Sequence, residues 1–119
     1  MNYETVIGIE IHCELKTKTK MFSGAPVAFG KVANTCVNEI DLGHPGCLPC
    51  VNKEAVRLAI KAATALHCEI DTLVRFDRKN YYYSDLPKGF QITQQFHPIG
   101  SGGWLEIETS QGKKKIRLN

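Results

Sequence analysis

Hydrophobic and polar residues alternate near the start of the chain, over residues 3–15. The odd-numbered positions are apolar or β-branched, and they include Ile7, Ile9 and Ile11. The even-numbered positions include Glu10, His12 and Glu14. Because successive side chains of a β-strand point to opposite faces, this period of two predicts a strand with one apolar and one polar face.

The polar face of this predicted strand carries groups that bind metal ions. A carboxylate and an imidazole two residues apart, such as Glu10 and His12, can reach the same divalent cation. Gly8 lies among the polar positions, where glycine weakens a strand and often marks the close approach of a ligand. The solvated face of an ordinary antiparallel sheet has the same alternation. The pattern therefore leaves both a metal site and a plain polar face open.

A helical period follows a loop rich in glycine, proline and asparagine at residues 33–49. Asn52 is a suitable N-cap, and Glu54 places a negative charge in the first turn. Apolar residues then recur at helical spacing, at Val56, Ala59, Ile60, Ala63 and Leu66. This spacing predicts a helix over about residues 53–67.

The rest of the chain reads as short strands. They are expected over residues 72–76, 91–96, 104–109 and 113–118, with a hairpin turn at residues 110–112. Several strands with short connections around one long helix predict an α+β fold, with a largely antiparallel sheet and one main helix. The last expected strand runs to the end of the sequence without a cap or turn, which indicates a domain that is cut short.

Size and charge narrow the possible functions. The chain has 119 residues, enough for one domain or part of one, and its net charge of +3 is too small to establish a nucleic-acid partner. Positive residues cluster at Lys16, Lys18, Lys20, Lys113–Lys115 and Arg117, as they do on RNA-binding surfaces and on protected edge strands. The sequence contains no apolar run near the roughly 18 residues of a membrane span and no secretory signal. We therefore expect a cytoplasmic or organellar-matrix protein.

Five cysteines in a chain without an export signal predict reduced thiols. Cys47 and Cys50 form a CxxC motif just before the expected helix, where a thiolate would be stabilised as in redox enzymes. A zinc site would need Cys36 or Cys13 as well, at irregular spacing. Free cysteines are most often small buried side chains. All three interpretations remain open.

Residues 77–94 combine cations, aromatic rings and polar groups. The set comprises Arg78, Lys79, Tyr81, Tyr82, Tyr83, Asp85, Lys88 and Gln91. Cations and hydroxyls suit phosphate, and aromatic rings stack on nucleobases. Since the sequence has no GxxxxGK[ST] loop, a nucleotide site here would depend on side chains and a metal. A polar loop with tyrosines in the core is the alternative.

Several motifs together resemble a known family. They are Glu4-Thr-Val-Ile-Gly-Ile-Glu-Ile-His12, Asn34-Thr35, Leu42-Gly-His-Pro-Gly46 with Leu48-Pro49, and Asp77-Arg-Lys-Asn-Tyr81 through Asp85-Leu-Pro-Lys-Gly-Phe-Gln-Ile92. In this order they resemble the B subunit of aspartyl/glutamyl-tRNA amidotransferase, over essentially the whole chain. Proteins of that family are considerably longer. The resemblance therefore implies that residues 1–119 are the N-terminal part of the family's catalytic domain, which is similar to glutamine synthetase, truncated at the C-terminus.

The resemblance implies a two-step reaction. ATP phosphorylates the side-chain carboxylate of misacylated Glu-tRNA(Gln) or Asp-tRNA(Asn), and ammonia then displaces the phosphate. The ammonia comes from a partner amidase subunit, while a small third subunit braces the complex. Glu10 and His12 match positions at the family's Mg²⁺ and phosphoryl-transfer site. Five further residues match motifs that line the same cavity: Lys79, Tyr83, Asp85, Lys88 and Gln91.

The sequence departs from the family pattern in two ways. The acidic His-x-Glu-Glu-Asp motif expected after Leu118 does not occur in this sequence, so the fragment alone is expected to be inactive. Zinc-bearing members have paired cysteines where this chain has Ser23, Ala25, Asn38 and Asp41, so no structural zinc is expected. A non-catalytic RNA-binding or complex-assembly module is the alternative function.

Overall fold

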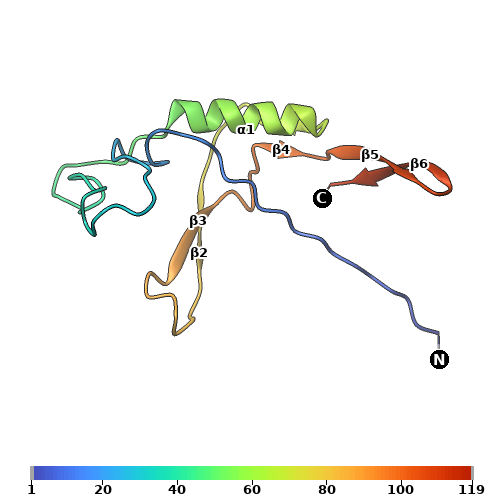
Figure 1. Ribbon diagram of the computed structural model, residues 1–119, viewed down its shortest axis with the longest axis horizontal. Coiled ribbons are helices and arrows are strands. Elements are labelled where there is room, and N and C mark those ends of the chain that lie inside the picture. Colours follow the sequence, from blue (N-terminus) through green and yellow to red (C-terminus); the bar gives the residue numbers. More distant parts are fainter. Residues whose placement is uncertain (1, 119) are drawn as a thin grey trace.

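The computed structural model describes residues 2–118, which form one helix and six short strands (Figure 1). The elements are α1 (Lys53–Ala65), β1 (Glu69–Ile70), β2 (Asp77–Asn80), β3 (Phe90–Thr93), β4 (Gly100–Ser101), β5 (Trp104–Thr109) and β6 (Gly112–Arg117). The loops that precede α1 gather near its N-terminal end, whereas the hairpins β2–β3 and β5–β6 project in different directions. No helix in this range has the length and apolar composition required to cross a bilayer.

Helix α1 begins at its predicted cap. The Asn52 side-chain oxygen accepts hydrogen bonds from the backbone N–H groups of Glu54 and Ala55, at 2.9 and 3.3 Å. These bonds satisfy two of the donors that the first turn of a helix leaves unpaired. Glu54 also forms an ion pair with Arg57 one turn later. The predicted helix is confirmed, with its end two residues earlier than expected.

The strands form three separate two-stranded antiparallel sheets, so the prediction of one largely antiparallel sheet is confirmed only in the direction of pairing. Hairpins β2–β3 and β5–β6 pair locally, and β1 pairs with β4. Residues 72–76, predicted as a strand, form none, and β2 starts directly after them. The physical reason is that a strand forms only where a neighbouring segment supplies ladder hydrogen bonds. The alternation of residues within one segment does not specify which other segment that is.

The N-terminal prediction needs the largest correction. Residues 3–15 are extended but form no β-ladder with any other described segment, and Figure 1 shows them running away from the rest of the chain. The side chains of Ile7, Ile9 and Ile11 are 78%, 84% and 84% exposed. The alternation is therefore present without the sheet that would bury its apolar face. The strand prediction for this segment is wrong within the described structure.

The end of α1 is joined tightly to the C-terminal hairpin. The backbone N–H of Trp104 donates to the carbonyl oxygen of Leu66 at 2.8 Å. At Gly103, a Cβ atom would lie 2.5 Å from Cys68 Sγ and 2.8 Å from the Leu66 oxygen, so only glycine allows this approach. The His67 ring then stacks on Trp104 with a centroid distance of 3.8 Å.

The buried core of the described residues is small. Its apolar members are Ala25, Ala55 and Ala63, and the polar Ser23 is also buried. Many large apolar side chains stay exposed, well beyond the first segment. Surfaces of this kind are typically covered by other protein. Local hairpins and caps, rather than a large core, therefore hold the described fold together.

Candidate functional site

Hairpin β2–β3 carries most of the predicted nucleotide-binding residues. In its antiparallel register Lys79 lies directly opposite Gln91, and Asn80 opposite Phe90. The backbone N–H of Tyr81 donates to the carbonyl oxygen of Gly89 at 3.0 Å, which closes the hairpin beyond the strands. Gly89 has a φ of +72°, a conformation that L-residues with a side chain rarely adopt. The hairpin therefore fixes Lys79 beside Gln91.

Two cations lie over one ring of the hairpin. Lys88 Nζ is 4.8 Å and Arg78 Cζ is 5.8 Å from the centroid of the Phe90 ring. Cations at these distances are attracted by the negative face of an aromatic ring. Both positive charges are consequently held near the Phe90 ring.

The tyrosines of the hairpin border a cavity of about 610 Å³. The Tyr81 and Tyr83 rings lie 5.9 Å apart, and Tyr82 is 94% exposed. The lining residues are Lys79, Asn80, Tyr81, Tyr82, Tyr83, Leu86 and Gln91. Three of the predicted nucleotide-binding residues, Lys79, Tyr83 and Gln91, thus meet in one cavity that offers a cation, aromatic rings and an amide.

A second cavity, of about 460 Å³, lies between the hairpin and the loop around Phe22. Lys88 and Gln91 line it, so Gln91 borders both cavities. Asp85 is exposed and lines neither of them. The structure therefore brings four of the five predicted residues to two adjoining cavities and leaves Asp85 outside them.

Glu10 and His12 lie together, but on the extended N-terminal segment rather than at the hairpin. His12 Nε2 is 3.6 Å from Glu10 Oε1, and the two side chains are 84% and 87% exposed. Their donor atoms can reach one cation, and a carboxylate with an imidazole fits a divalent metal. Residues 2–118 contain no group of three or more His, Cys, Asp or Glu side chains that could hold a metal ion. The two residues thus supply part of a ligand set.

Comparison with known proteins decides the family. A family model described as the GatB/GatE catalytic domain matches residues 5–119. The chain belongs to this family. It is 60% identical over 118 residues to the B subunit of aspartyl/glutamyl-tRNA(Asn/Gln) amidotransferase from Geobacillus thermodenitrificans, an alignment that covers 99% of this chain and 25% of the relative. The B subunit from Mycoplasma capricolum is 61% identical over 115 residues, or 97% of this chain and 24% of the relative.

The GatB/GatE match confirms the resemblance found in the sequence motifs. The chain spans about a quarter of the length of the curated relatives it matches. The relatives are subunits of an amidotransferase, and this chain is homologous to the GatB catalytic domain. The roles of individual residues remain predictions.

Two loops, around residues 20–25 and 38–41, are joined by Asp41. The Asp41 carboxylate accepts hydrogen bonds from Lys20 Nζ at 3.0 Å, Ser23 Oγ at 2.9 Å and the Asn38 N–H at 3.0 Å. The Asn38 side-chain oxygen in turn accepts from the N–H groups of Ile40 and Asp41. Only 18% of the Asp41 side chain is exposed. The bonds from Lys20 and Ser23 to Asp41 therefore connect the two loops.

The same contacts set the pKa of Asp41. Desolvation by neighbouring atoms raises the pKa, but the hydrogen bonds from Lys20, Ser23 and Asn38 and the Lys20 charge outweigh it, so the pKa is lowered. Sequence reasoning assigned Asp41 no role beyond a missing ligand. The spacing of Asn38 and Asp41, which suits an Asx turn, was the available signal.

We expect the ionised Asp41 to stabilise the chain above the ordinary aspartate pKa. Because its folded-state pKa is the lower one, this contribution is complete above about pH 4 and is lost as the pH falls through the folded value. Asp41→Asn should lower the urea midpoint of unfolding at pH 6, and the difference from the unmodified chain should shrink below about pH 4. Asp85→Asn, which removes an exposed carboxylate, is the control. Equal midpoints for both variants at pH 6 would contradict the role of Asp41.

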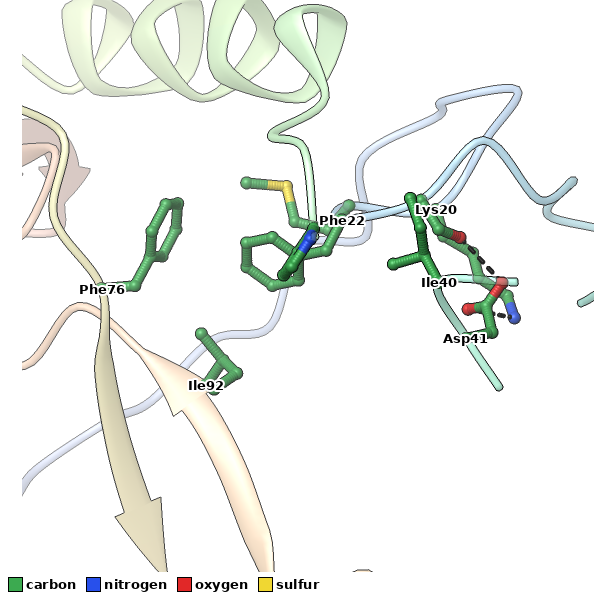
Figure 2. Close-up of a pocket in the computed structure, with 9 residues that line it drawn as sticks. Lys20, Phe22, Ile40, Asp41, Phe76 and Ile92 are labelled. Atoms are coloured by element: carbon green, nitrogen blue, oxygen red, sulfur yellow. Dashed lines mark hydrogen bonds and ion pairs between the residues drawn. The ribbon is translucent and has the colours of Figure 1, made fainter. Parts of the chain in front are cut away.

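A third cavity, of about 420 Å³ and mostly apolar, lies between these loops and the hairpin (Figure 2). Phe22 and Phe76 both line it and contact each other edge to face, with ring centroids 5.1 Å apart and planes at 83°. The lining residues are Lys20, Met21, Phe22, Ser23, Ile40, Asp41, Pro49, Phe76 and Ile92. No local pattern pointed to Phe22 or Phe76, because they are 54 positions apart and meet only in the folded chain.

The cysteines are free thiols throughout the described residues. Cys47 is half-buried and Cys50 is exposed, so the interpretation of both as buried core side chains is wrong for Cys50. The zinc interpretation lacks a third ligand, since residues 2–118 hold no suitable group of three. The redox interpretation of the CxxC pair stays untested.

The basic C-terminal hairpin is partly neutralised by its own strands. In the β5–β6 register Glu106 lies opposite Lys115, and Glu108 opposite Lys113. Lys113 Nζ is 2.8 Å from Glu106 Oε1, and Lys115 Nζ lies 3.8 Å from the centroid of the Trp104 ring. Two of the three clustered lysines therefore have partners within the hairpin.

Proposed function

We propose that this chain is the N-terminal part of the catalytic domain of an ATP-dependent, glutamine-using aminoacyl-tRNA amidotransferase. The observation that carries the proposal is hairpin β2–β3, where Lys79 pairs with Gln91 beside a tyrosine-lined cavity. Membership in the GatB/GatE catalytic-domain family supports it. A domain similar to glutamine synthetase and a location in the cytoplasm or an organellar matrix belong to the same proposal.

The proposed reaction has two steps. The terminal phosphoryl group of ATP passes to a carboxylate oxygen of the glutamate or aspartate esterified to tRNA, and ADP leaves. The nitrogen of ammonia then attacks the carbonyl carbon, the bond to the phosphate oxygen breaks, and loss of a proton leaves the amide. The substrates are misacylated Glu-tRNA(Gln) or Asp-tRNA(Asn).

The proposed enzyme is a complex of three different proteins. A partner amidase subunit supplies the ammonia, while a small third subunit completes the assembly. The relatives are named as B subunits, which supports the presence of further components in the complex. This chain would therefore carry out its reaction only together with these partners and the rest of its own domain.

The residues of the chain serve this reaction by binding and charge neutralisation. Lys79 and Lys88 offer positive charge to phosphate oxygens. Tyr83 provides an aromatic ring and a hydroxyl group, and Gln91 provides a side-chain amide. Asp85 belongs to the same proposed site, although it lies outside the two cavities. Glu10 and His12 would hold Mg²⁺. The metal, when bound, would neutralise charge on the transferred phosphoryl group.

A chimeric protein tests the proposal. In the chimera, residues 1–119 of this chain replace the matching quarter of GatB from Geobacillus thermodenitrificans, and the product is assembled with that organism's partner proteins. We expect ATP-dependent conversion of Glu-tRNA(Gln) or Asp-tRNA(Asn) to the amide, at a rate within about tenfold of the unmodified relative. The 119-residue chain alone should show none. A correctly assembled chimera without amidation would overturn the proposal.

The alternative, a non-catalytic RNA-binding or assembly module, depends on the lysines of β6. Replacing Lys113, Lys114 and Lys115 with glutamate in the chimera should leave ATP cleavage and Mg²⁺ binding intact, because none of these lysines lines the cavities beside hairpin β2–β3. Filter binding of labelled tRNA provides the second measurement. If tRNA binding disappears while a chimera without these substitutions cleaves no ATP, the alternative is the better description.

A further inference from the structure

Hairpin β2–β3 stands apart from the other secondary structure. Within the described residues, β2 and β3 lie close to each other and to no other helix or strand. Figure 1 shows the hairpin pointing away from α1. Hydrogen bonds at its open end, from Gln94 Nε2 to the Arg75 oxygen and from the Phe96 N–H to Asp77 Oδ2, connect one arm to the other. These bonds hold the hairpin together but do not fix its direction.

Phe22 supplies a contact between this hairpin and the rest of the chain. Its ring meets Phe76 edge to face, at a centroid distance of 5.1 Å. Phe76 directly precedes β2 and lies three residues before Lys79. Edge-to-face aromatic pairs have a preferred geometry, so they restrict orientation as well as burying surface. Figure 2 shows Phe22 on the loop below the start of α1, with Phe76 at the top of the hairpin.

The loop that carries Phe22 is itself anchored to α1. The carbonyl oxygens of Met21 and Phe22 accept hydrogen bonds from the N–H groups of Asn52 and Cys50, at 2.8 and 3.0 Å. The side-chain nitrogen Nδ2 of Asn52 also donates to the carbonyl oxygens of Thr19 and Lys20, at 3.1 and 3.2 Å. Asn52 is at the same time the N-cap of the helix. The loop therefore holds the Phe22 backbone in a fixed position relative to α1.

We propose that Phe22 is a positioning residue for the nucleotide site, because its contact with Phe76 sets the direction in which hairpin β2–β3 presents Lys79 and Gln91. The identity of the ligand in this inference rests on the proposed function. The contact that links Phe22 to the hairpin does not depend on that function. The link runs from the helix cap through the anchored loop and the two rings to the strand. Phe22 also borders the cavity of about 460 Å³ that Lys88 and Gln91 line, but its role in this scheme is exerted through Phe76.

The test uses MgATP and the chimera with Phe22→Leu, Phe22→Tyr and Phe29→Leu. Phe29 is fully exposed, at 105% of its reference area, so its replacement makes the same chemical change without loss of packing. Phe22→Leu should raise the KM for ATP by about 2- to 10-fold, the range that one aromatic pair contributes, with a smaller change in kcat. Phe22→Tyr keeps the ring, and the adjoining cavity of about 420 Å³ has room for a hydroxyl, so it should restore the KM.

Amide hydrogen exchange at residues 77–80 and 90–93 is the second readout. Exchange at the hairpin should become faster in Phe22→Leu and stay unchanged in Phe29→Leu, while exchange in α1 stays the same in both. Faster exchange spread equally over α1 and the hairpin would reveal a general loss of stability and overturn the inference. Equal behaviour of Phe22→Leu and Phe29→Leu in both measurements would also overturn it. If the chimera binds no MgATP, the proposed function fails, and hairpin exchange alone decides the role of Phe22.

Discussion

Replacing Glu10 with glutamine in the chimera is expected to reduce tRNA-dependent ATP cleavage on the order of 10²- to 10³-fold. The amide keeps the size of the side chain but removes the negative charge that lies 3.6 Å from His12 Nε2. A divalent cation bound by this pair would lose one of its charged ligands, and the phosphoryl group would lose the charge neutralisation that the cation provides. Cleavage is measured as phosphate release with Mg²⁺ and misacylated tRNA, and binding of the tRNA is measured in parallel.

The neighbouring Glu14 supplies the matched control for this experiment. Like Glu10, it belongs to the polar face of the alternating segment, is exposed and lies two residues from His12. The ion pair with His12 is formed by Glu10, so Glu14→Gln makes an equal change of charge outside that pair. We expect Glu14→Gln to cleave ATP at nearly the unmodified rate, and His12→Ala to lose activity as Glu10→Gln does. If Glu10→Gln retains full cleavage, the N-terminal segment is a scaffold, and the metal ligands must be sought elsewhere in the chimera.

Replacing Lys79 with methionine is expected to weaken ATP binding by about 10- to 150-fold. Methionine retains much of the length and apolar stem of lysine, but it cannot donate a charge-assisted hydrogen bond to phosphate. Lys79 lines the tyrosine cavity and is fixed opposite Gln91 by the strand register, so the lost charge is not readily replaced by another side chain. The measurement is the KM for ATP in the chimera, together with direct binding of MgATP.

Lys61→Met is the control for the lysine variant. Lys61 is exposed on α1 and lines none of the three cavities described above. Lys61→Met should leave the KM for ATP unchanged. If the KM rises by a similar factor in both variants, the effect of Lys79→Met is due to a general loss of positive charge. A Lys79→Met chimera with an unchanged KM would exclude Lys79 from phosphate binding.

The sequence predicted some residues of the candidate site and gave no indication of others. Motifs identified Lys79 and Gln91, and the hairpin register then placed them side by side. Glu10 and His12 are adjacent because a two-residue spacing on an extended chain puts them on one side, whether or not a sheet is present. Phe22 and Phe76 carried no signal, since neither belongs to a local pattern that distinguishes a contact from an isolated aromatic side chain.

Local interactions explain what the sequence by itself determined. Helix α1 follows from an N-cap and helical spacing, and hairpin β5–β6 follows from two alternating segments around a short turn. In both cases the residues that form hydrogen bonds with each other are near in sequence. The local pattern therefore predicts the pairing as well as the element. The family was likewise readable from motifs along the chain, and the GatB/GatE match agrees with it.

Only the tertiary structure decided how these elements are assembled. Residues 3–15 have a strong strand pattern, yet they form no ladder within the described residues, because ladder hydrogen bonds depend on a partner that periodicity does not specify. The expected single sheet is instead three separate pairs for the same reason. The anchoring of Phe22 by Asn52 and its contact with Phe76 arise from chain segments far apart in sequence. Local periodicity thus determined the elements, and long-range packing determined the direction in which they present the candidate site.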